Sequence, residues 1–178
     1  MGFHVSYLAC KNTAASDVCA ALGLVHTGTP SEPFETMFSI ATLPGGWTVL
    51  AANDTFFVAG ELLTVLSAHR TVLGCQVDEG INYSSTACYA DGQQQWMVIH
   101  HPEHDPQDLQ IFHTPPPEFA AIRDRLMAQQ RETGESEGVD YIFDIPVELF
   151  HAITGYRHDR WKFDWGEPAF TKVEAPMP

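Results

Sequence analysis

The chain has 178 residues, of which 44% are hydrophobic, and this length suits one domain with a sizeable core of its own. Nine Lys and Arg residues stand against 23 Asp and Glu residues, so the formal net charge is −14. A surface of that sign repels phosphate backbones, which argues against nucleic-acid binding. No apolar run approaches the ~20 residues of a membrane span, and no secretory signal is recognisable. A cytoplasmic protein is therefore expected.

Alternating apolar and polar residues predict strands along most of the chain, with helices between some of them. In chain order, strands are expected at residues 3–10, 37–43, 47–53, 71–79, 82–90, 94–101 and 109–114. Helices are expected at residues 14–24, 58–69 and 147–154, and a further helix starts at the prolines of 115–117. Leu62, Val65 and Leu66 are expected to face inward from the second helix. Residues 25–35 contain Pro and Gly and are interpreted as a loop.

Turn residues indicate how the strands connect. Residues 44–46, Pro-Gly-Gly, predict one hairpin and Asp91-Gly92 predicts another. Four consecutive strands with short connections predict an antiparallel meander over residues 71–114. The fold class is therefore α+β, a mainly antiparallel sheet with about four helices packed on it. We interpret residues 1–178 as one domain, with an acidic linker at 134–138 and an aromatic, charged tail at 157–178.

Sequence motifs for catalysis or cofactor binding do not emerge. The four cysteines are widely spaced among apolar neighbours, which predicts buried free thiols rather than a zinc ribbon. The sequence has no Gly-x-Ser-x-Gly, P-loop or Gly-x-Gly-x-x-Gly pattern. Asp144 stands just before Pro146 and is expected to cap the last helix. No catalytic residue and no cofactor is therefore predicted.

The stretch HHPEHDPQDLQIFH, residues 100–113, holds four of the nine histidines and raises the question of a metal site. A turn within residues 102–107 pairs Val98 with Ile111 and places neighbouring histidines on opposite faces of their strand. Only His101, His104 and Asp105 can then converge, at the hairpin tip. These three are the candidate metal ligands of an alternative interpretation, a metal-dependent or other hydrolase.

The C-terminal stretch RHDRWKFDWGEPAF places aromatic residues between charged ones. Trp161, Phe163 and Trp165 alternate with Lys162 and Asp164, which predicts a strand with three rings on one face. That much apolar area is costly in water, so we expect residues 157–170 to join a sheet edge or pack across the domain. Trp161 and Trp165 are expected to be at least half buried, in the free protein or against a partner.

Acidic residues concentrate between Glu103 and Glu148, where eleven acidic and three basic residues give a net charge of −8. A field of that sign steers a basic partner toward the surface. The candidate partner-binding residues combine this segment with the aromatic tail: Trp161, Phe163, Trp165, Glu103, Asp105 and Asp108.

Residues 45–77, GGWTVLAANDTFFVAGELLTVLSAHRTVLGCQV, and the later YADGQQQW resemble a bacterial protein family without an assigned activity. In that family a GGWT strand precedes a helix ending in L-x-x-LS, then a strand and a DG hairpin. The resemblance covers about residues 40–100, and no residue role is carried over from it. By analogy of type, small acidic bacterial proteins without catalytic motifs are often immunity proteins, which neutralise a toxin by binding it.

These observations favour a small, acidic, cytosolic bacterial binding protein, of the immunity type, that neutralises a basic toxin by direct contact. Another cytosolic protein is the alternative partner, and a homodimer is the alternative assembly. Besides the hydrolase, a small-ligand domain with a pocket lined by Trp47, Tyr83 and Trp96 stays open. Neither nucleic acid nor a membrane is an expected partner.

Overall fold

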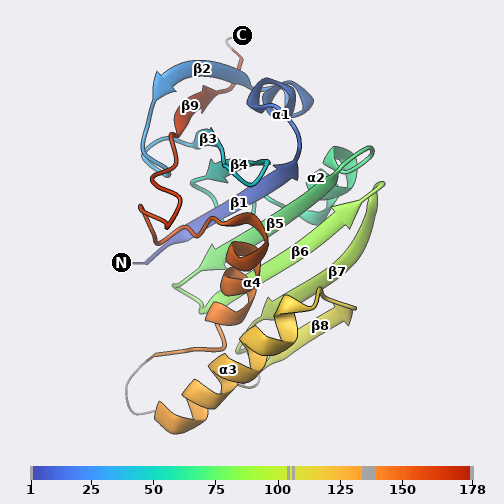
Figure 1. Ribbon diagram of the computed structural model, residues 1–178, viewed down its shortest axis with the longest axis vertical. Coiled ribbons are helices and arrows are strands. Elements are labelled where there is room, and N and C mark those ends of the chain that lie inside the picture. The colour runs from blue at the N-terminus through green and yellow to red at the C-terminus, as the bar shows by residue number, and fades with distance from the viewer. Residues whose placement is uncertain (1, 104, 106, 134–138, 177–178) are drawn as a thin grey trace.

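The computed structural model describes residues 2–103, 105, 107–133 and 139–176. In this part of the chain, nine strands form one antiparallel sheet in the order β2-β9-β3-β4-β1-β5-β6-β7-β8 (Figure 1). The predicted α+β class is therefore confirmed. The strands are β1 (His4–Lys11), β2 (Val25–Pro30), β3 (Phe38–Thr42), β4 (Trp47–Ala52), β5 (Thr71–Asp78), β6 (Tyr83–Ala90), β7 (Gln93–His100), β8 (Leu109–His113) and β9 (Thr171–Glu174).

Helices cover both faces of the sheet. They are α1 (Ala15–Ala21), α2 (Gly60–Leu66), α3 (Glu118–Thr133) and α4 (Asp144–Thr154). Helices α3 and α4 lie in front of the sheet in Figure 1 and bury one apolar cluster, whereas α1 and α2 bury a second cluster on the opposite face. Because both faces are covered, the central strand β1 is almost wholly buried and consists of mostly apolar residues.

The predicted turns are confirmed by the backbone. Gly46 has φ 76° in the β3–β4 hairpin, and Asp91 and Gly92 have φ 52° and 73° between β6 and β7. Two consecutive residues with positive φ are the requirement of a type I′ hairpin turn. The predicted pairing of Val98 with Ile111 is also found, so strands β5 to β8 form the expected meander.

Two strands at the other side of the sheet differ from the expectations. Residues 25–35 were expected to be a loop, but β2 lies within them and pairs with β9. β2 is an edge strand whose six residues are all exposed, so it needs no apolar face. The sequence therefore shows no alternating pattern that would predict it. The strand expected at residues 161–165 is also wrong, because the tail strand is β9, at Thr171–Glu174.

The inward face of α2 also differs from its prediction. Leu66 is buried as expected, but Val65 is 71% exposed and Leu63 takes its place in the core. Leu62 is partly buried against the same cluster, so the inward face of this seven-residue helix consists of Leu62, Leu63 and Leu66.

The chain contains no membrane-spanning helix among the residues described: none of its helices is both long enough and apolar enough. The acidic linker predicted at 134–138 lies outside the described residues. The four cysteines are buried and free, as predicted. Burial raises the pKa of Cys10, Cys75 and Cys88 to about 11, so these thiols stay protonated near neutral pH.

Candidate binding site at the C-terminal segment

Arg157 is the centre of an ion-pair network that fastens the C-terminal segment to α4. Its Nη2 lies 2.7 Å from Asp144 Oδ1, and its Nη1 lies 3.0 Å from Glu148 Oε2. Its Nε lies 2.7 Å from Asp159 Oδ1. Arg125 of α3 adds a contact of 2.8 Å to Glu148. The network therefore joins α3, α4 and the residues that follow α4, and it uses every nitrogen of the Arg157 guanidinium.

The predicted capping role of Asp144 is wrong. The N-cap of α4 is Phe143, which makes no side-chain cap, and Asp144 accepts a hydrogen bond from Arg157 instead. Asp140 performs the local capping: its Oδ1 accepts the backbone N–H groups of Ile142 and Phe143 at 2.9 and 3.1 Å. The helix begins at Asp144 itself, so this side chain lies in the first turn rather than at the N-cap, and its hydrogen bond goes to Arg157.

The carboxylates around Arg157 respond differently to their burial. Burial raises the pKa of Asp144, and the charge of Arg157 offsets this only in part. Burial also opposes ionisation of Asp159, but the hydrogen bond and charge of Arg157 outweigh it and lower the pKa of Asp159. Burial disfavours the charged guanidinium as well, yet its bonds to these two carboxylates raise the pKa of Arg157. Arg157 is therefore permanently charged and fully paired.

His158 follows directly and is buried beneath the segment. Its Nδ1 is hydrogen-bonded to the Tyr7 hydroxyl at 3.3 Å, and the Phe3 ring meets it edge-on with centroids 4.8 Å apart. Burial lowers the pKa of His158; Asp159 opposes this shift, whereas the charge of Arg157 adds to it. The imidazole is therefore neutral at pH 7 and contributes packing contacts rather than a charge.

The three aromatic residues of the tail do not share one face. The rings of Phe163 and Trp165 stack, with centroids 5.1 Å apart and planes at 2°, and both pack against the core. Trp165 Nε1 donates to the carbonyl of Gly155 at 3.2 Å. Trp161 is 71% exposed. The expected burial is thus confirmed for Trp165 and is wrong for Trp161 in the free protein, which leaves contact with a partner as the prediction for that ring.

A pocket of about 330 Å³ opens beside Trp161, and we call it the tail pocket. Three segments that are distant in the sequence line it: the residue before β1, the connection between β2 and β3, and the segment between α4 and β9. Its aromatic residues are Phe3, Phe34 and Trp161, and its carboxylates include Glu32 and Glu167. The Phe3 and Phe34 rings meet edge to face, with centroids 6.3 Å apart.

This lining has the chemistry of a site for a cationic side chain. Aromatic faces attract a positive charge, and carboxylates accept hydrogen bonds from ammonium or guanidinium groups. Within the described residues, Glu32 and Glu167 form no ion pair, whereas Asp159 is already bound to Arg157. Arg160 also lines the pocket, so two free carboxylates stand against one local cation.

The other predicted partner-binding residues lie elsewhere. Glu103, Asp105 and Asp108 belong to the connection between β7 and β8, and β8 is the edge strand farthest from β9 (Figure 1). The tail pocket instead lies where β1 begins. The predicted set therefore separates into two groups, and Trp161 is its one member that lines the tail pocket.

His100 is a buried anchor of the fold. Its side chain is fully buried, with Nδ1 2.7 Å from the carbonyl of Asp108 and Nε2 3.1 Å from Asp140 Oδ2. Asn82 Nδ2 donates to the same carboxylate oxygen. Burial opposes ionisation of Asp140, but the hydrogen bonds from His100 and Asn82 outweigh it and lower its pKa to about 2. This contact ties the start of α4 to β7.

The candidate metal site is only partly described. His101 packs on the Tyr83 ring, with centroids 5.6 Å apart, and lies 3.7 Å from Glu103. His104 lies outside the described residues, so a site formed by His101, His104 and Asp105 stays a prediction. Within the described ranges, no three His, Cys, Asp or Glu side chains are grouped as metal ligands.

The predicted small-ligand pocket is wrong in its composition. Trp47 and Trp96 are buried in the cluster beneath α3 and α4. Tyr83 lies on the opposite face of the sheet, because side chains alternate along β6 and its neighbour Ser84 bonds to the carbonyl of Phe143 at the start of α4. The three rings therefore do not line one pocket.

Comparisons with known proteins do not indicate a function for this chain. No family model matches the chain, and neither a curated protein nor a solved structure was found that matches it. The resemblance of residues 40–100 to a bacterial family therefore stays an expectation.

Sequence reasoning missed most of the tail pocket. Phe3 was assigned to a strand face, and Glu32 and Phe34 fell in the segment interpreted as a loop. No local pattern joins these residues, because long-range pairing of β2 and β3 with β9 brings them to the tail. The one available signal was Trp161, a large apolar residue between charged ones.

Proposed function

We propose that the protein binds a basic protein partner, and that the tail pocket receives an arginine or lysine side chain of that partner. Trp161 carries the proposal: a tryptophan that is 71% exposed lies beside two free carboxylates, on a chain with net charge −14. Exposed aromatic rings in such settings are typical contact anchors.

The physical mechanism has two stages. The net charge first steers a basic partner toward the surface, which raises the association rate at low ionic strength. Trp161 and the neighbouring rings then lose their contact with water as the cationic side chain enters. Glu32 and Glu167 accept its hydrogen bonds, and the desolvated ring faces strengthen the attraction.

An immunity-type role is the specific form of this proposal. An acidic protein that covers the basic surface of a bacterial toxin neutralises it by occupation alone, without a catalytic group. The proposal needs neither a metal nor a cofactor on this chain.

Co-purification from the native cell, followed by mass spectrometry, tests the proposal. Wild-type protein is compared with Trp161→Ala and with the matched control Phe56→Ala, which removes another exposed ring, one that does not line the tail pocket. We expect a protein of high isoelectric point to be retained by the wild type and the control, and lost with Trp161→Ala or at high salt.

Recovery of the free monomer alone, or of a self-dimer that survives Trp161→Ala, contradicts the proposal. If Trp161→Ala retains the same basic partner, the protein binds that partner through a surface other than the tail pocket.

A further inference from the structure

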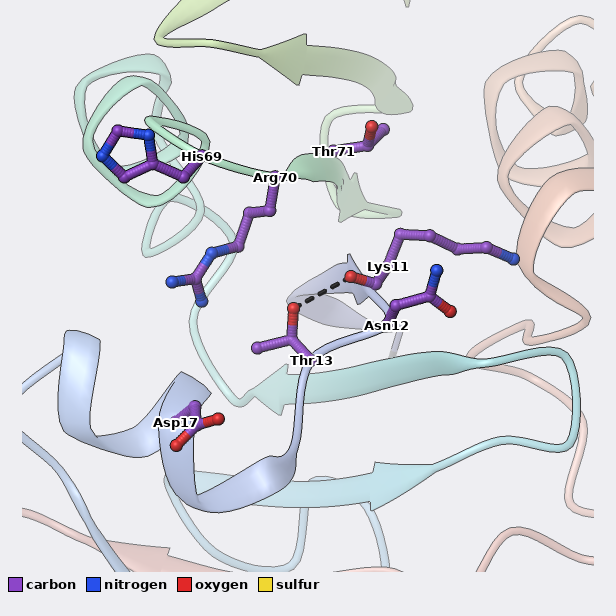
Figure 2. Close-up of a pocket in the computed structure, with 7 residues that line it drawn as sticks. All are labelled: Lys11, Asn12, Thr13, Asp17, His69, Arg70 and Thr71. Atoms are coloured by element: carbon purple, nitrogen blue, oxygen red, sulfur yellow. Dashed lines mark hydrogen bonds between the residues drawn. The ribbon is translucent and has the colours of Figure 1, made fainter.

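The few basic residues of this chain are unevenly placed. Residues 1–122 contain twelve acidic residues but only two basic ones, Lys11 and Arg70. Both line the same pocket, of about 510 Å³, together with Asn12, Thr13, Asp17, His69 and Thr71 (Figure 2). We call it the Arg70 pocket. It is a different cavity from the tail pocket and has no lining residue in common with it.

The sheet brings the two cations together. Strands β1 and β5 are antiparallel neighbours, with Cys10 opposite Val72, so the last residues of β1 and the first residues of β5 lie side by side at one end of the strands. Lys11 is the last residue of β1, and Arg70 directly precedes β5. Residues 12 and 13 lead from β1 into α1, and Asp17 lies in the first turn of that helix.

Arg70 is a partly buried arginine without an ion-pair partner, whereas Arg131 and Arg160, which also form no ion pair among the described residues, are exposed. The Nη1 of Arg70 is buried and has no hydrogen-bond partner, and no ion pair involves its guanidinium within the described residues. Lys11, by contrast, donates to the carbonyl of Gly45 at 2.8 Å and lies over the Trp47 ring. Its ammonium group points away from the space in front of Arg70 (Figure 2).

Asp17 supplies the opposite charge on the other wall of the pocket. Figure 2 shows the Arg70 guanidinium directed toward α1, which carries Asp17, with Thr13 to the side of the space between them. Asp17 is exposed, and neither it nor Arg70 forms an ion pair within the described part of the chain. The Thr13 hydroxyl donates to the carbonyl of Lys11 at 2.9 Å and keeps its lone pairs as acceptors.

We infer that the Arg70 pocket binds a small zwitterion of the α-amino acid class, with the ligand carboxylate at Arg70 and its ammonium group at Asp17. A guanidinium matches a carboxylate in shape and in hydrogen-bond geometry. A purely anionic ligand would satisfy Arg70 but face Asp17 and the negative field of the whole chain. A zwitterion pairs both groups, adds no net charge, and suits a pocket with a polar lining.

The experiment is a titration of uniformly ¹⁵N-labelled protein, followed by NMR, with each of the twenty standard amino acids. For the amino acid that binds best, two matched probes follow: the acid that lacks its amino group and the amine that lacks its carboxylate. We expect saturable shifts of the amides of residues 11–17 and 69–71. Binding of either matched probe should be at least ten-fold weaker.

Three variants accompany the titration. Arg70→Gln should weaken binding of the amino acid at least ten-fold, whereas the control Arg131→Gln, at an exposed arginine of α3, should leave it unchanged. Asp17→Asn, at an exposed position that does not contribute to the core, should weaken the amino acid but not the deaminated acid.

The inference is overturned if no amino acid shifts these amides, or if Arg70→Gln binds as well as wild type while its melting temperature is intact. Equal or tighter binding of the deaminated acid or of inorganic phosphate also overturns it, because the pocket would then be a plain anion site.

Discussion

Arg157 and Arg70 are two arginines in one acidic chain, and the fold treats them in opposite ways. Arg157 is 7% exposed and is surrounded by three carboxylates. Arg70 has a buried nitrogen without a partner and no carboxylate within ion-pair distance in the described residues. Arg131 and Arg160 also form no ion pair in the described part of the chain, but both are exposed, so the buried nitrogen of Arg70 is the feature that requires an explanation.

The comparison separates an arginine that holds the structure from one for which we propose a ligand. A charge that is buried with its partners stabilises the arrangement it belongs to, and loses much when one partner is removed. A buried donor without a partner costs free energy in the folded state. Substitutions at the two positions should therefore differ in sign.

The largest effect is expected for Arg157→Met. The substitution leaves Asp144, Glu148 and Asp159 close together without their cation, so the free energy of unfolding should fall by about 3–5 kcal/mol. Urea denaturation at pH 7 measures it, with Arg131→Gln as a control that should change stability by less than ~0.5 kcal/mol. A loss below ~1 kcal/mol would show that the network does not hold the tail to α4.

The second effect is a pH dependence next to Arg157. Burial lowers the pKa of His158 from 6.5 to about 4, so the unfolded chain binds a proton before the folded protein does. The part of the stability that depends on a neutral His158 is therefore fully present above pH 6.5. It is lost as the pH falls toward 4, and the free energy of unfolding drops by about 3 kcal/mol over that window. The half-buried His151, whose pKa burial also lowers, acts in the same direction.

Urea denaturation between pH 7 and pH 4 measures this dependence. His158→Gln should flatten most of the slope, whereas His69→Gln, at an exposed histidine, should keep it. An unchanged slope in His158→Gln would mean that the buried imidazole is not the group that titrates.

The third effect has the opposite sign to the first. Arg70→Met keeps an unbranched, flexible stem that reaches as far as the arginine Nε and removes a buried donor without a partner, so the free energy of unfolding should rise by up to about 1 kcal/mol. Thermal unfolding in buffer free of amino acids measures it. A loss of more than ~1 kcal/mol would show that Arg70 is a structural residue like Arg157.

The smallest effect is expected for Trp161→Ala, at the tail pocket. Since the ring is 71% exposed, its removal should change the free energy of unfolding by less than ~0.5 kcal/mol. Phe150→Ala provides the contrast, because that buried ring of α4 should cost about 3–5 kcal/mol. A large loss for Trp161→Ala would mean that the ring packs internally and is not a contact residue.

Local patterns in the sequence were enough for the meander and its turns. Asp91 and Gly92 suit the positive φ of a tight hairpin, and alternation along β5 to β7 follows from the pleat, so both were predictable. β2 was not predictable, because a fully exposed edge strand shows no alternation of apolar and polar residues. β9 was not predictable either, since its place between β2 and β3 depends on strands more than 120 residues away in the sequence.

The candidate sites were harder to predict than the fold for the same reason. Trp161 was predicted to be a contact residue from its neighbours alone, and that role stays a prediction. Phe3 and Phe34 reach the tail pocket only through long-range strand pairing. Likewise, nothing in the local sequence joins Lys11 to Arg70. The antiparallel pairing of β1 with β5 does so, and only the folded chain reveals that its first two basic residues share a pocket.

The most direct test of the proposed function is an NMR titration of the Trp161 indole N–H with acetyl-arginine amide, with acetyl-citrulline amide as the uncharged control of the same shape. The account predicts a saturable shift with the arginine compound that shrinks at high salt, is absent with citrulline, and is lost in Glu32→Gln/Glu167→Gln. An unchanged indole resonance, or equal shifts with both compounds, would contradict a pocket that recognises a cationic side chain.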